Sequence, residues 1–440
     1  MSPSEMLIKN QQGTFSNDAH CKSFLNACYI DAKTNVDYTK KPNQTFEDAN
    51  SQNDPKIPLV KETIDNDDID NLIDWLKGYP HLTKGKETIE FEKQWSKFMG
   101  VNYSVFVNSG SSAILLMLYA LIESGELSRG DKVVVPAVSW ATDLAPVIQL
   151  GLEPVLCDCN LEDLSIDINH FKTLVNKKKP KVLILVSVLG LVPAMDNITE
   201  ICDLNDVILL EDVCEGLGSA FQHQKLGTFG LMSAFSTYFG HHISTIEGGV
   251  ISTNDVEIYN ILKSIRSHGW DRDMDENHRD KLRKDFPCND FQSLYKFYYC
   301  GFNMRSTDLQ AYLGILQIKK LQKILESRAK NYKLYRNLLS EKFWKPVNGS
   351  NGDFVSNFSY PVITPVRQLI IDELSAQNIA TRPLISGSME NQPFWKKREN
   401  KKLNLKNANV VDAQGMYLPN NHQITVEEIE RICSIVNQFA

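Results

Sequence analysis

The sequence predicts an α/β protein in which a mixed, mostly parallel sheet lies between layers of helices, with a smaller α+β domain at the C-terminal end. Three observations support this fold class. Short apolar runs recur through the middle of the chain, as expected of strands that are buried on both faces. Segments with helical apolar spacing alternate with these runs, which is the pattern of βα units. A chain of 440 residues also exceeds the usual size of one domain, so a second domain is expected.

The first predicted elements are two helices that follow a polar segment. Residues 1–56 are rich in Asn, Asp, Lys and Gln, and we expect an extension there, partly disordered or packed on the surface, without a chemical role. Helical apolar spacing then covers residues 67–76 and 87–98. Each of these stretches is followed by a glycine, Gly78 or Gly100, as is common at the end of a helix.

Strands and helices alternate in the central part of the chain. Ser104-Val-Phe-Val107 predicts the first strand, and Ser109-Gly-Ser-Ser predicts the start of a helix that runs to Glu123. Another helix is expected from Asp143. Further strands are predicted over residues 132–136, 153–157, 181–187 and 207–212.

The last third of the chain has a different pattern. A long helix is predicted from Thr307 to about Leu339, and a mixed region follows to Ala440. We therefore expect a large α/β domain over residues 57–310 and a small α+β domain over residues 311–440.

Composition narrows the classes of function. The net charge is −7 with mixed signs, so no basic surface indicates nucleic acid as a partner, and no apolar run is long enough to indicate a membrane span. The first residues lack the pattern of a secretory signal, and nine cysteines are scattered without disulfide spacing, which favours the cytoplasm. The closest pair, Cys157 and Cys159, ends a predicted strand, where packed thiols are more common than metal ligands. No metal site is predicted.

Two segments that follow predicted strands contain candidate site residues, which the local sequence pattern indicates without reference to any known protein. Asn108-Ser-Gly-Ser-Ser112 joins a strand to a helix, where free N–H groups and small side chains can hold an anion, although an ordinary helix cap has the same pattern. Asp212 and Glu215 follow a buried strand. Carboxylates at the carboxyl end of a parallel strand point toward the crevice where such sheets bind ligands, although a solvated loop acid is the alternative.

One segment gives these junctions a chemical context. It is Ser233-Ala-Phe-Ser-Thr-Tyr-Phe-Gly-His-His-Ile-Ser-Thr-Ile-Glu-Gly-Gly249, and it resembles the cofactor segment of the DegT/StrS-type sugar aminotransferases. That family binds pyridoxal phosphate and has the aspartate-aminotransferase-like fold, fold type I. In the family a lysine precedes the acidic-Gly-Gly turn by six residues, whereas here the position six before Glu247 is His241. A slip of one residue would instead place His242 there.

The exchange of lysine for histidine changes the expected reaction. An imidazole has no primary amine to bond to the cofactor aldehyde, but it can move protons near neutral pH. Within the family this exchange marks the sugar-nucleotide 3-dehydratase branch. A sub-branch with an iron–sulfur cluster has a Cys-x-Cys motif, which is missing here, since only Cys288 and Cys300 lie between this segment and Asn303.

The resemblance also assigns roles to individual residues. His241 is expected to be the catalytic base, with Asp212 paired to the pyridine nitrogen of the cofactor. Trp140 is expected to stack on the ring, and Asn303 to reach the phosphate in the neighbouring subunit of a homodimer. Phosphate contacts are expected from Gly110, Ser111 and Ser236, and weaker substrate contacts from Glu215, His268 and Arg382.

The implied reaction uses pyridoxamine phosphate, made from pyridoxal phosphate with glutamate. It removes the C3 hydroxyl of a nucleotide-linked 4-keto-6-deoxy sugar, with GDP-4-keto-6-deoxymannose favoured, for 3,6-dideoxy sugars of the colitose type in lipopolysaccharide O-antigen. Two alternatives remain open. The protein could complete amino transfer onto a keto sugar, or it could be a retired homologue that only binds or regulates.

Overall fold

The computed structural model describes residues 56–347, 352–399 and 402–440. The predicted N-terminal extension lies outside these ranges, apart from its last residue. Seven strands form the main sheet, and four of its neighbouring pairs are parallel: β2/β3, β2/β4, β4/β5 and β5/β8. Strand β9 pairs antiparallel with both β1 and β8, so the sheet is mixed but mostly parallel, as predicted. In chain order the strands are β1 (Tyr103–Val107), β2 (Lys132–Pro136), β3 (Glu153–Cys157), β4 (Val182–Val186), β5 (Ile208–Asp212), β8 (Met232–Ser236) and β9 (Gly249–Thr253), and their order in the sheet is β1-β9-β8-β5-β4-β2-β3.

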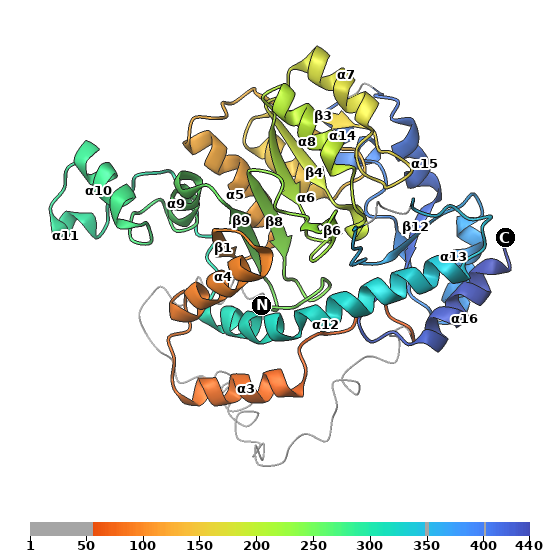
Figure 1. Cartoon of the computed structure of the whole chain (residues 1–440). Coiled ribbons are helices and arrows are strands. Elements are labelled where there is room, and N and C mark those ends of the chain that lie inside the picture. The colour runs from red at the N-terminus through yellow and green to blue at the C-terminus, as the bar shows by residue number, and fades with distance from the viewer. Residues whose placement is uncertain (1–55, 348–351, 400–401) are drawn as a thin grey trace, which may run out of the picture. The chain divides into compact units, whose positions relative to one another are not determined.

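Helices cover both faces of this sheet (Figure 1). Successive strand residues point to opposite faces, so Val133 and Val135 of β2 pack into one apolar cluster and Val134 packs into the other. Burial on both faces explains why the strands are continuous apolar runs. One face is covered by α5 (Gly110–Glu123), α6 (Ala141–Gln149) and α9 (Val256–Ile265), and the other by α4 (Lys86–Met99), α7 (Ile168–Lys178) and α8 (Met195–Leu204).

The predicted elements are confirmed, with small shifts at their ends. Helix α3 (Asn66–Lys77) and α4 match the first two predicted helices. Helix α5 begins where expected, because the Ser109 hydroxyl accepts a hydrogen bond from the Ser112 N–H at 3.1 Å. Helix α6 begins two residues before Asp143, with Trp140 as its N-cap residue.

A long helix links the main sheet to a second sheet. Helix α12 (Asp308–Leu338) packs against α4 near its start, where Gly314 lies against the ring of Phe91. Near its end the ring of Tyr335 stacks on Tyr360 with ring centroids 5.0 Å apart. The second sheet is antiparallel, in the order β10-β12-β11, and its elements are β10 (Tyr360–Ile363), α13 (Arg367–Ala376), β11 (Arg382–Pro383), α15 (Lys406–Gln414), β12 (Gly415–Leu418) and α16 (Val426–Asn437).

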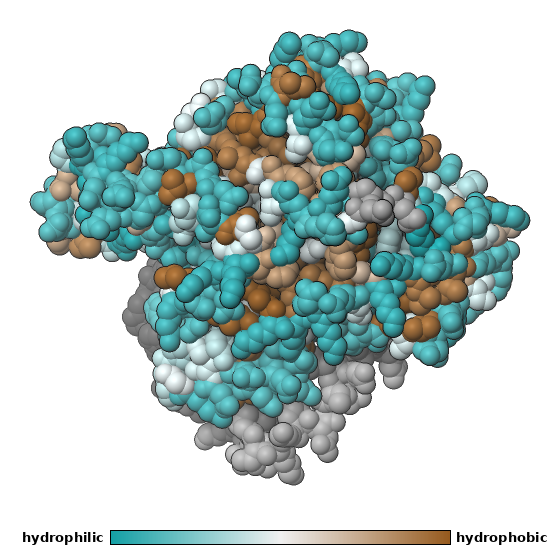
Figure 2. All heavy atoms as spheres, in the orientation of Figure 1, coloured by the Kyte–Doolittle hydropathy of each residue, from teal (hydrophilic) through white to brown (hydrophobic). Residues whose placement is uncertain are grey.

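The second sheet with its helices is the smaller C-terminal domain that the sequence predicts. The expected boundary at residues 310/311 falls within the first turn of α12, and it stays a prediction. On the face shown in Figure 2 the outer helices are mostly hydrophilic, and apolar side chains gather toward the middle, above α12. Helices α10 (Glu276–Asp285) and α11 (Asp290–Ser293) project away from the sheet in Figure 1.

Candidate active site

The candidate site lies at the carboxyl ends of the parallel strands. Strands β1, β2, β4, β5 and β8 run in the same direction, so the segments that follow them meet at one edge of the sheet. Most of the residues predicted from the sequence lie on these segments. Such an edge is where open α/β sheets bind their ligands.

Three of these segments approach each other at the first residue of α5. A Cβ atom added to Gly110 would lie 2.9 Å from the Cβ of Ser236 and 3.1 Å from the Sγ of Cys214. Only glycine therefore fits at this position without moving its neighbours. The first turn of α5 contains no acidic residue, and Ser111 is exposed on it. Small residues, free N–H groups and the positive end of a helix together form a cradle for a small anion.

A chain of contacts joins the β2 and β5 ends of the site. The backbone N–H of Trp140 donates a hydrogen bond to Oδ2 of Asp143 at 3.2 Å. The carboxyl group of Asp143 also lies within hydrogen-bonding distance of Asp212. The N–H of Cys214 donates to Oδ1 of Asp212 at 2.9 Å. Trp140 is 56% exposed, although Ser139 and Asp143 on either side of it are fully buried. An exposed indole beside buried carboxyl groups provides a flat apolar surface for a ring.

The two carboxyl groups are affected by each other and by burial. Burial raises the pKa of Asp143 well above its ordinary value, and the nearby charges of Asp212 and Glu215 raise it further. Burial also raises the pKa of Asp212, but the hydrogen bonds from Cys214 and Asp143 oppose this rise. Sequence reasoning treated Asp143 only as the start of a helix. Its signal was an acid in the first turn of an otherwise apolar helix.

Glu215 lies on the segment after β5. Its Oε2 accepts a hydrogen bond from the Leu189 N–H at 2.8 Å. Burial raises the pKa of Glu215 to about 8, helped by the charge of Asp212. Burial raises the pKa of Tyr417 on β12 to about 12; the charge of Glu215 adds to the rise and that of Arg382 opposes it. Arg382 itself is exposed on β11, so it lies at the C-terminal-domain side of the site.

The two adjacent histidines have different surroundings. His242 is fully buried, and its Nε2 lies 3.0 Å from the carbonyl oxygen of Ser356. His241 is partly exposed, and its ring lies 5.3 Å from that of Phe358. Burial lowers the pKa of His241 to about 4, with the nearby charge of Arg328 acting in the same direction. His241 is therefore the imidazole with access to the site, and it is neutral at physiological pH.

Arg328 of α12 holds the loop that carries the histidines, and sequence reasoning missed it. Its side chain is 1% exposed and donates to the Phe358 carbonyl at 2.8 Å and to the His241 carbonyl at 3.4 Å. A third bond goes to the carbonyl of Asn420. Its signal in the sequence was an arginine on the apolar face of a helix, between Leu321 and Tyr335.

Two predicted residues, Asn303 and His268, lie on segments that pair with each other, and the Met304 carbonyl beside Asn303 accepts the Asn108 N–H at 3.1 Å. Asn303 is exposed, accepts a hydrogen bond from Nε of Arg305 at 3.0 Å, and pairs through its backbone with Ser267. His268 has a positive φ of 63°, and its ring meets that of Trp270 edge to face. Neither residue contacts Asp212 or His241 within the described chain. Asn303 is thus positioned toward the surface rather than into its own site.

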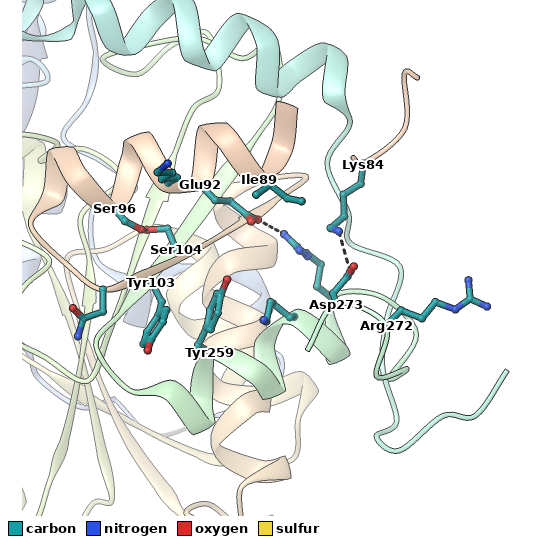
Figure 3. Close-up of a pocket in the computed structure, with 13 residues that line it drawn as sticks. Lys84, Ile89, Glu92, Ser96, Tyr103, Ser104, Tyr259, Arg272 and Asp273 are labelled. Carbon is teal, nitrogen blue, oxygen red and sulfur yellow. Dashed lines mark hydrogen bonds and ion pairs between the residues drawn. The ribbon is translucent and has the colours of Figure 1, made fainter. Parts of the chain in front are cut away.

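A separate hollow of about 570 Å³ lies between α4 and α9, beside the edge strand β1 (Figure 3). Glu92 pairs with Arg266 at 2.5 Å on one side of it, and Lys84 pairs with Asp273 at 3.0 Å on the other. None of the predicted site residues lines this hollow. Lys93, Lys263 and Arg272 also line it, so it is a cationic hollow that lies apart from the candidate active site.

The described residues contain neither a metal-binding cluster nor a helix able to span a membrane. Over residues 56–347, 352–399 and 402–440, no three His, Cys, Asp or Glu side chains are grouped so that they could hold a metal ion. In the same part of the chain, no helix combines the length and apolar character that crossing a membrane requires.

Comparison with known proteins places this site in a family. The chain matches the DegT/DnrJ/EryC1/StrS aminotransferase family over residues 62–437. A Yersinia pseudotuberculosis protein named GDP-4-keto-6-deoxy-D-mannose 3-dehydratase is 34% identical over 398 residues, which cover 87% of this chain and 98% of that protein. The Escherichia coli GDP-4-keto-6-deoxy-D-mannose-3-dehydratase structure with bound hydrated PLP has a TM-score of 0.78 and 31% identity, covering 87% of this chain and 99% of that one.

A second solved structure is similar to this chain to the same degree. GDP-4-keto-6-deoxymannose-3-dehydratase with a trapped PLP–glutamate geminal diamine has a TM-score of 0.77 and 31% identity, covering 86% of this chain and 99% of that one. These similarities confirm the predicted aspartate-aminotransferase-like fold. Since the family match covers most of its length, this chain belongs to the DegT/DnrJ/EryC1/StrS aminotransferase family.

Proposed function

We propose that this protein is a pyridoxamine-phosphate-dependent 3-dehydratase. Its substrate is a nucleotide-linked 4-keto-6-deoxy sugar, GDP-4-keto-6-deoxymannose, and glutamate supplies the amine of the cofactor. The observation that carries the proposal is His241, an accessible neutral imidazole at the position where the aminotransferases of the family have a lysine. Relatives named for this reaction cover nearly the whole folded chain.

The residues at the edge of the sheet fit the cofactor. Because Gly110 has no side chain, the start of α5 can lie close to Ser236 and Cys214, which brings its N–H groups beside the Ser236 hydroxyl. An exposed Trp140 offers a stacking face, and Asp212 offers a buried carboxylate for a ring nitrogen. Oδ1 of Asp143 is buried and receives no hydrogen bond from the described residues. Burying a carboxyl oxygen without a hydrogen bond costs free energy, so this pair of carboxyl groups is not explained by packing of the core alone.

Each residue then has a task in binding. The N–H groups at Gly110 and Ser111 and the hydroxyl of Ser236 bind the phosphate, while the indole of Trp140 covers one face of the ring. Asp212 holds a proton on the ring nitrogen by accepting its hydrogen bond. When bound, pyridoxamine phosphate supplies a primary amine for the sugar ketone and a ring that accepts an electron pair. Because His241 cannot bond to the cofactor, these contacts must hold it without a covalent link.

His241 moves the proton in the reaction. Its pKa of about 4 leaves the ring unprotonated at neutral pH, so one ring nitrogen has a lone pair that can accept a proton. The same nitrogen, once protonated, is the economical donor for the hydroxyl that leaves from C3. Glu215 is the second candidate donor, because a pKa of about 8 keeps its carboxyl group protonated at neutral pH.

Product analysis tests this function against the alternatives. The protein is incubated with glutamate, pyridoxal phosphate and GDP-4-keto-6-deoxymannose, and the sugar products and ammonia are measured by mass spectrometry and an ammonia assay. Dehydration gives a 3-deoxy ketone and one ammonia for each sugar consumed. A stable amino sugar would support amino transfer instead, and failure to bind pyridoxal phosphate would support a retired homologue.

A homodimer with shared sites is part of the proposal. Asn303 is exposed, as expected of a residue that reaches the phosphate in a neighbouring subunit. The projecting segment around α10 and α11 exposes large apolar side chains, among them Phe291 at 84% and Tyr295 at 73%. Apolar groups gathered on one projection are typical of an interface. Sedimentation should give twice the chain mass, and subunits carrying His241→Asn mixed with subunits carrying Asn303→Ala should regain activity.

The cytoplasm is the proposed location. All seven cysteines of the described residues are free thiols, and four of them are buried. Free thiols are maintained in a reducing compartment. Cell fractionation with detection of the native protein would test this assignment, and recovery from a secreted fraction would contradict it.

A further inference from the structure

We propose that Asp143 is a positioning residue for this reaction: its carboxyl group stays protonated and donates a hydrogen bond to Asp212, which remains the ionised partner of the ring nitrogen. The inference rests on the proposed function, because it concerns the same site. It adds a residue that the sequence did not single out and assigns the proton within a buried carboxyl pair.

The position of Asp143 makes it a link between two cofactor contacts. Its side chain is fully buried in the first turn of α6. One oxygen, Oδ2, accepts a hydrogen bond from the backbone N–H of Trp140 at 3.2 Å. The carboxyl group also lies within hydrogen-bonding distance of the Asp212 side chain. The other oxygen, Oδ1, receives no hydrogen bond from the described residues, although it is buried. A proton on this carboxyl group would supply the missing bond, since a protonated acid donates and Asp212 accepts.

Two buried carboxyl groups in contact cannot both be ionised without a large electrostatic penalty. Asp212 has the better support for a negative charge, because the Cys214 N–H donates to it at 2.9 Å and the Cys214 thiol also faces it. Asp143 accepts only the backbone N–H of Trp140, so a negative charge on it would be less well supported. The proton therefore belongs on Asp143.

The groups around this pair come from several elements. Asp212, Cys214 and Glu215 face Asp143 from β5 and the segment after it, and His241 is close to the backbone of Cys214 on the loop after β8. Burial raises the pKa of the Cys214 thiol, so it is neutral. His241 and Cys214 are neutral, and a pKa of about 8 keeps Glu215 protonated at neutral pH. Asp212 is therefore the anion that the hydrogen bond from Asp143 holds in place.

Two substitutions at Asp143 test whether the site needs a hydrogen-bond donor there or a negative charge. Asp143→Asn resembles the protonated acid, because its oxygen can accept the Trp140 N–H and its amide can donate to Asp212. Asp143→Leu has a similar size but removes both bonds. Asp163→Asn is the matched control, since Asp163 is a half-buried acid with a raised pKa of about 6 but is not in the site.

The main readout is the ring nitrogen itself. Pyridoxal phosphate labelled with ¹⁵N at the ring is bound to each protein, and the ¹⁵N chemical shift reports whether that nitrogen is protonated. We expect the Asn variant and the control to keep the protonated signal and to bind within about 3-fold of the native affinity. The Leu variant should lose at least tenfold in affinity and shift the signal toward the unprotonated form. An Asn variant as impaired as the Leu variant would overturn the inference, because charge and not the donated bond would then matter.

A measurement without cofactor tests the proton directly. A buried acid that stays protonated makes the folded protein less stable as pH rises, because only the unfolded chain ionises. We expect the urea midpoint of the native protein to fall relative to that of Asp143→Asn as pH rises above 4, and equal pH profiles would overturn the assignment. This result does not depend on the reaction. Failure of the native protein to bind pyridoxal phosphate would instead refute the proposed function.

Discussion

Glu215→Gln probes the electrostatics of the site through stability. Glutamine keeps the acceptor for the Leu189 N–H, which bonds to Glu215 at 2.8 Å, but it cannot ionise. The pKa of Glu215 rises from its ordinary 4.5 to about 8 on folding. The contribution of Glu215 to the free energy of unfolding is therefore fully present below pH 4.5. It is lost as pH rises toward 8, because the unfolded chain releases a proton that the folded chain retains.

The size of the effect follows from the width of this pH window. Each pH unit between 4.5 and about 8 removes about 1.4 kcal/mol, which gives a ceiling of about 5 kcal/mol. Glu215 is only partly buried, so water screens part of this penalty, and we expect roughly 2–3 kcal/mol. Relative to the native protein, the glutamine variant should gain this much stability between pH 5 and pH 8.

Urea unfolding of cofactor-free protein at pH 5, 6, 7, 8 and 9 measures the difference. Glu247→Gln is the matched control, because Glu247 is exposed on the same edge of the sheet and should change the free energy of unfolding little at any pH. A difference between the native and Glu215→Gln proteins that is constant from pH 5 to pH 8 would show that Glu215 does not stay protonated on folding. So would a variant that becomes relatively less stable as pH rises.

Three further substitutions test other parts of the site. His241→Lys should abolish dehydration and give a visible absorption band with pyridoxal phosphate, trapped by borohydride as a covalent adduct; unchanged dehydration would remove His241 from its role. Gly110→Ala places a Cβ 2.9 Å from that of Ser236 and 3.1 Å from the sulfur of Cys214, so the affinity for pyridoxal phosphate, measured by fluorescence titration, should fall at least tenfold. Arg328→Met removes three hydrogen bonds to buried carbonyls and should lower the free energy of unfolding by about 2–4 kcal/mol, measured with urea; an unchanged value would show that water replaces the guanidinium.

Much of the fold was predictable because the chain signals its strands and helix starts locally. The apolar run of β5 and the capping serine at Ser109 each specify an element within a few residues. The acidic end of β5 and the histidine segment also carried the candidate roles of Asp212 and His241. These signals are strong because they combine a buried strand with polar residues at the end that faces the ligand.

Other features could not be read from the sequence because they depend on distant contacts. The carboxyl pair needs α6 and β5 to meet, and the fixed loop at His241 needs Arg328, which lies far along the chain on α12. The choice between His241 and His242 also depends on packing, since the carbonyl that approaches His242 belongs to Ser356.

Single-turnover analysis is the most direct test of the central claim, that an imidazole at position 241 removes the C3 hydroxyl. Protein loaded with pyridoxamine phosphate is mixed with GDP-4-keto-6-deoxymannose, and ammonia and sugar products are measured for the native protein and for His241→Asn. We expect one ammonia and one 3-deoxy ketone per bound cofactor for the native protein, and neither product for the variant despite equal cofactor binding. A native product that retains the nitrogen as an amino sugar, or a variant that dehydrates at the native rate, would contradict it.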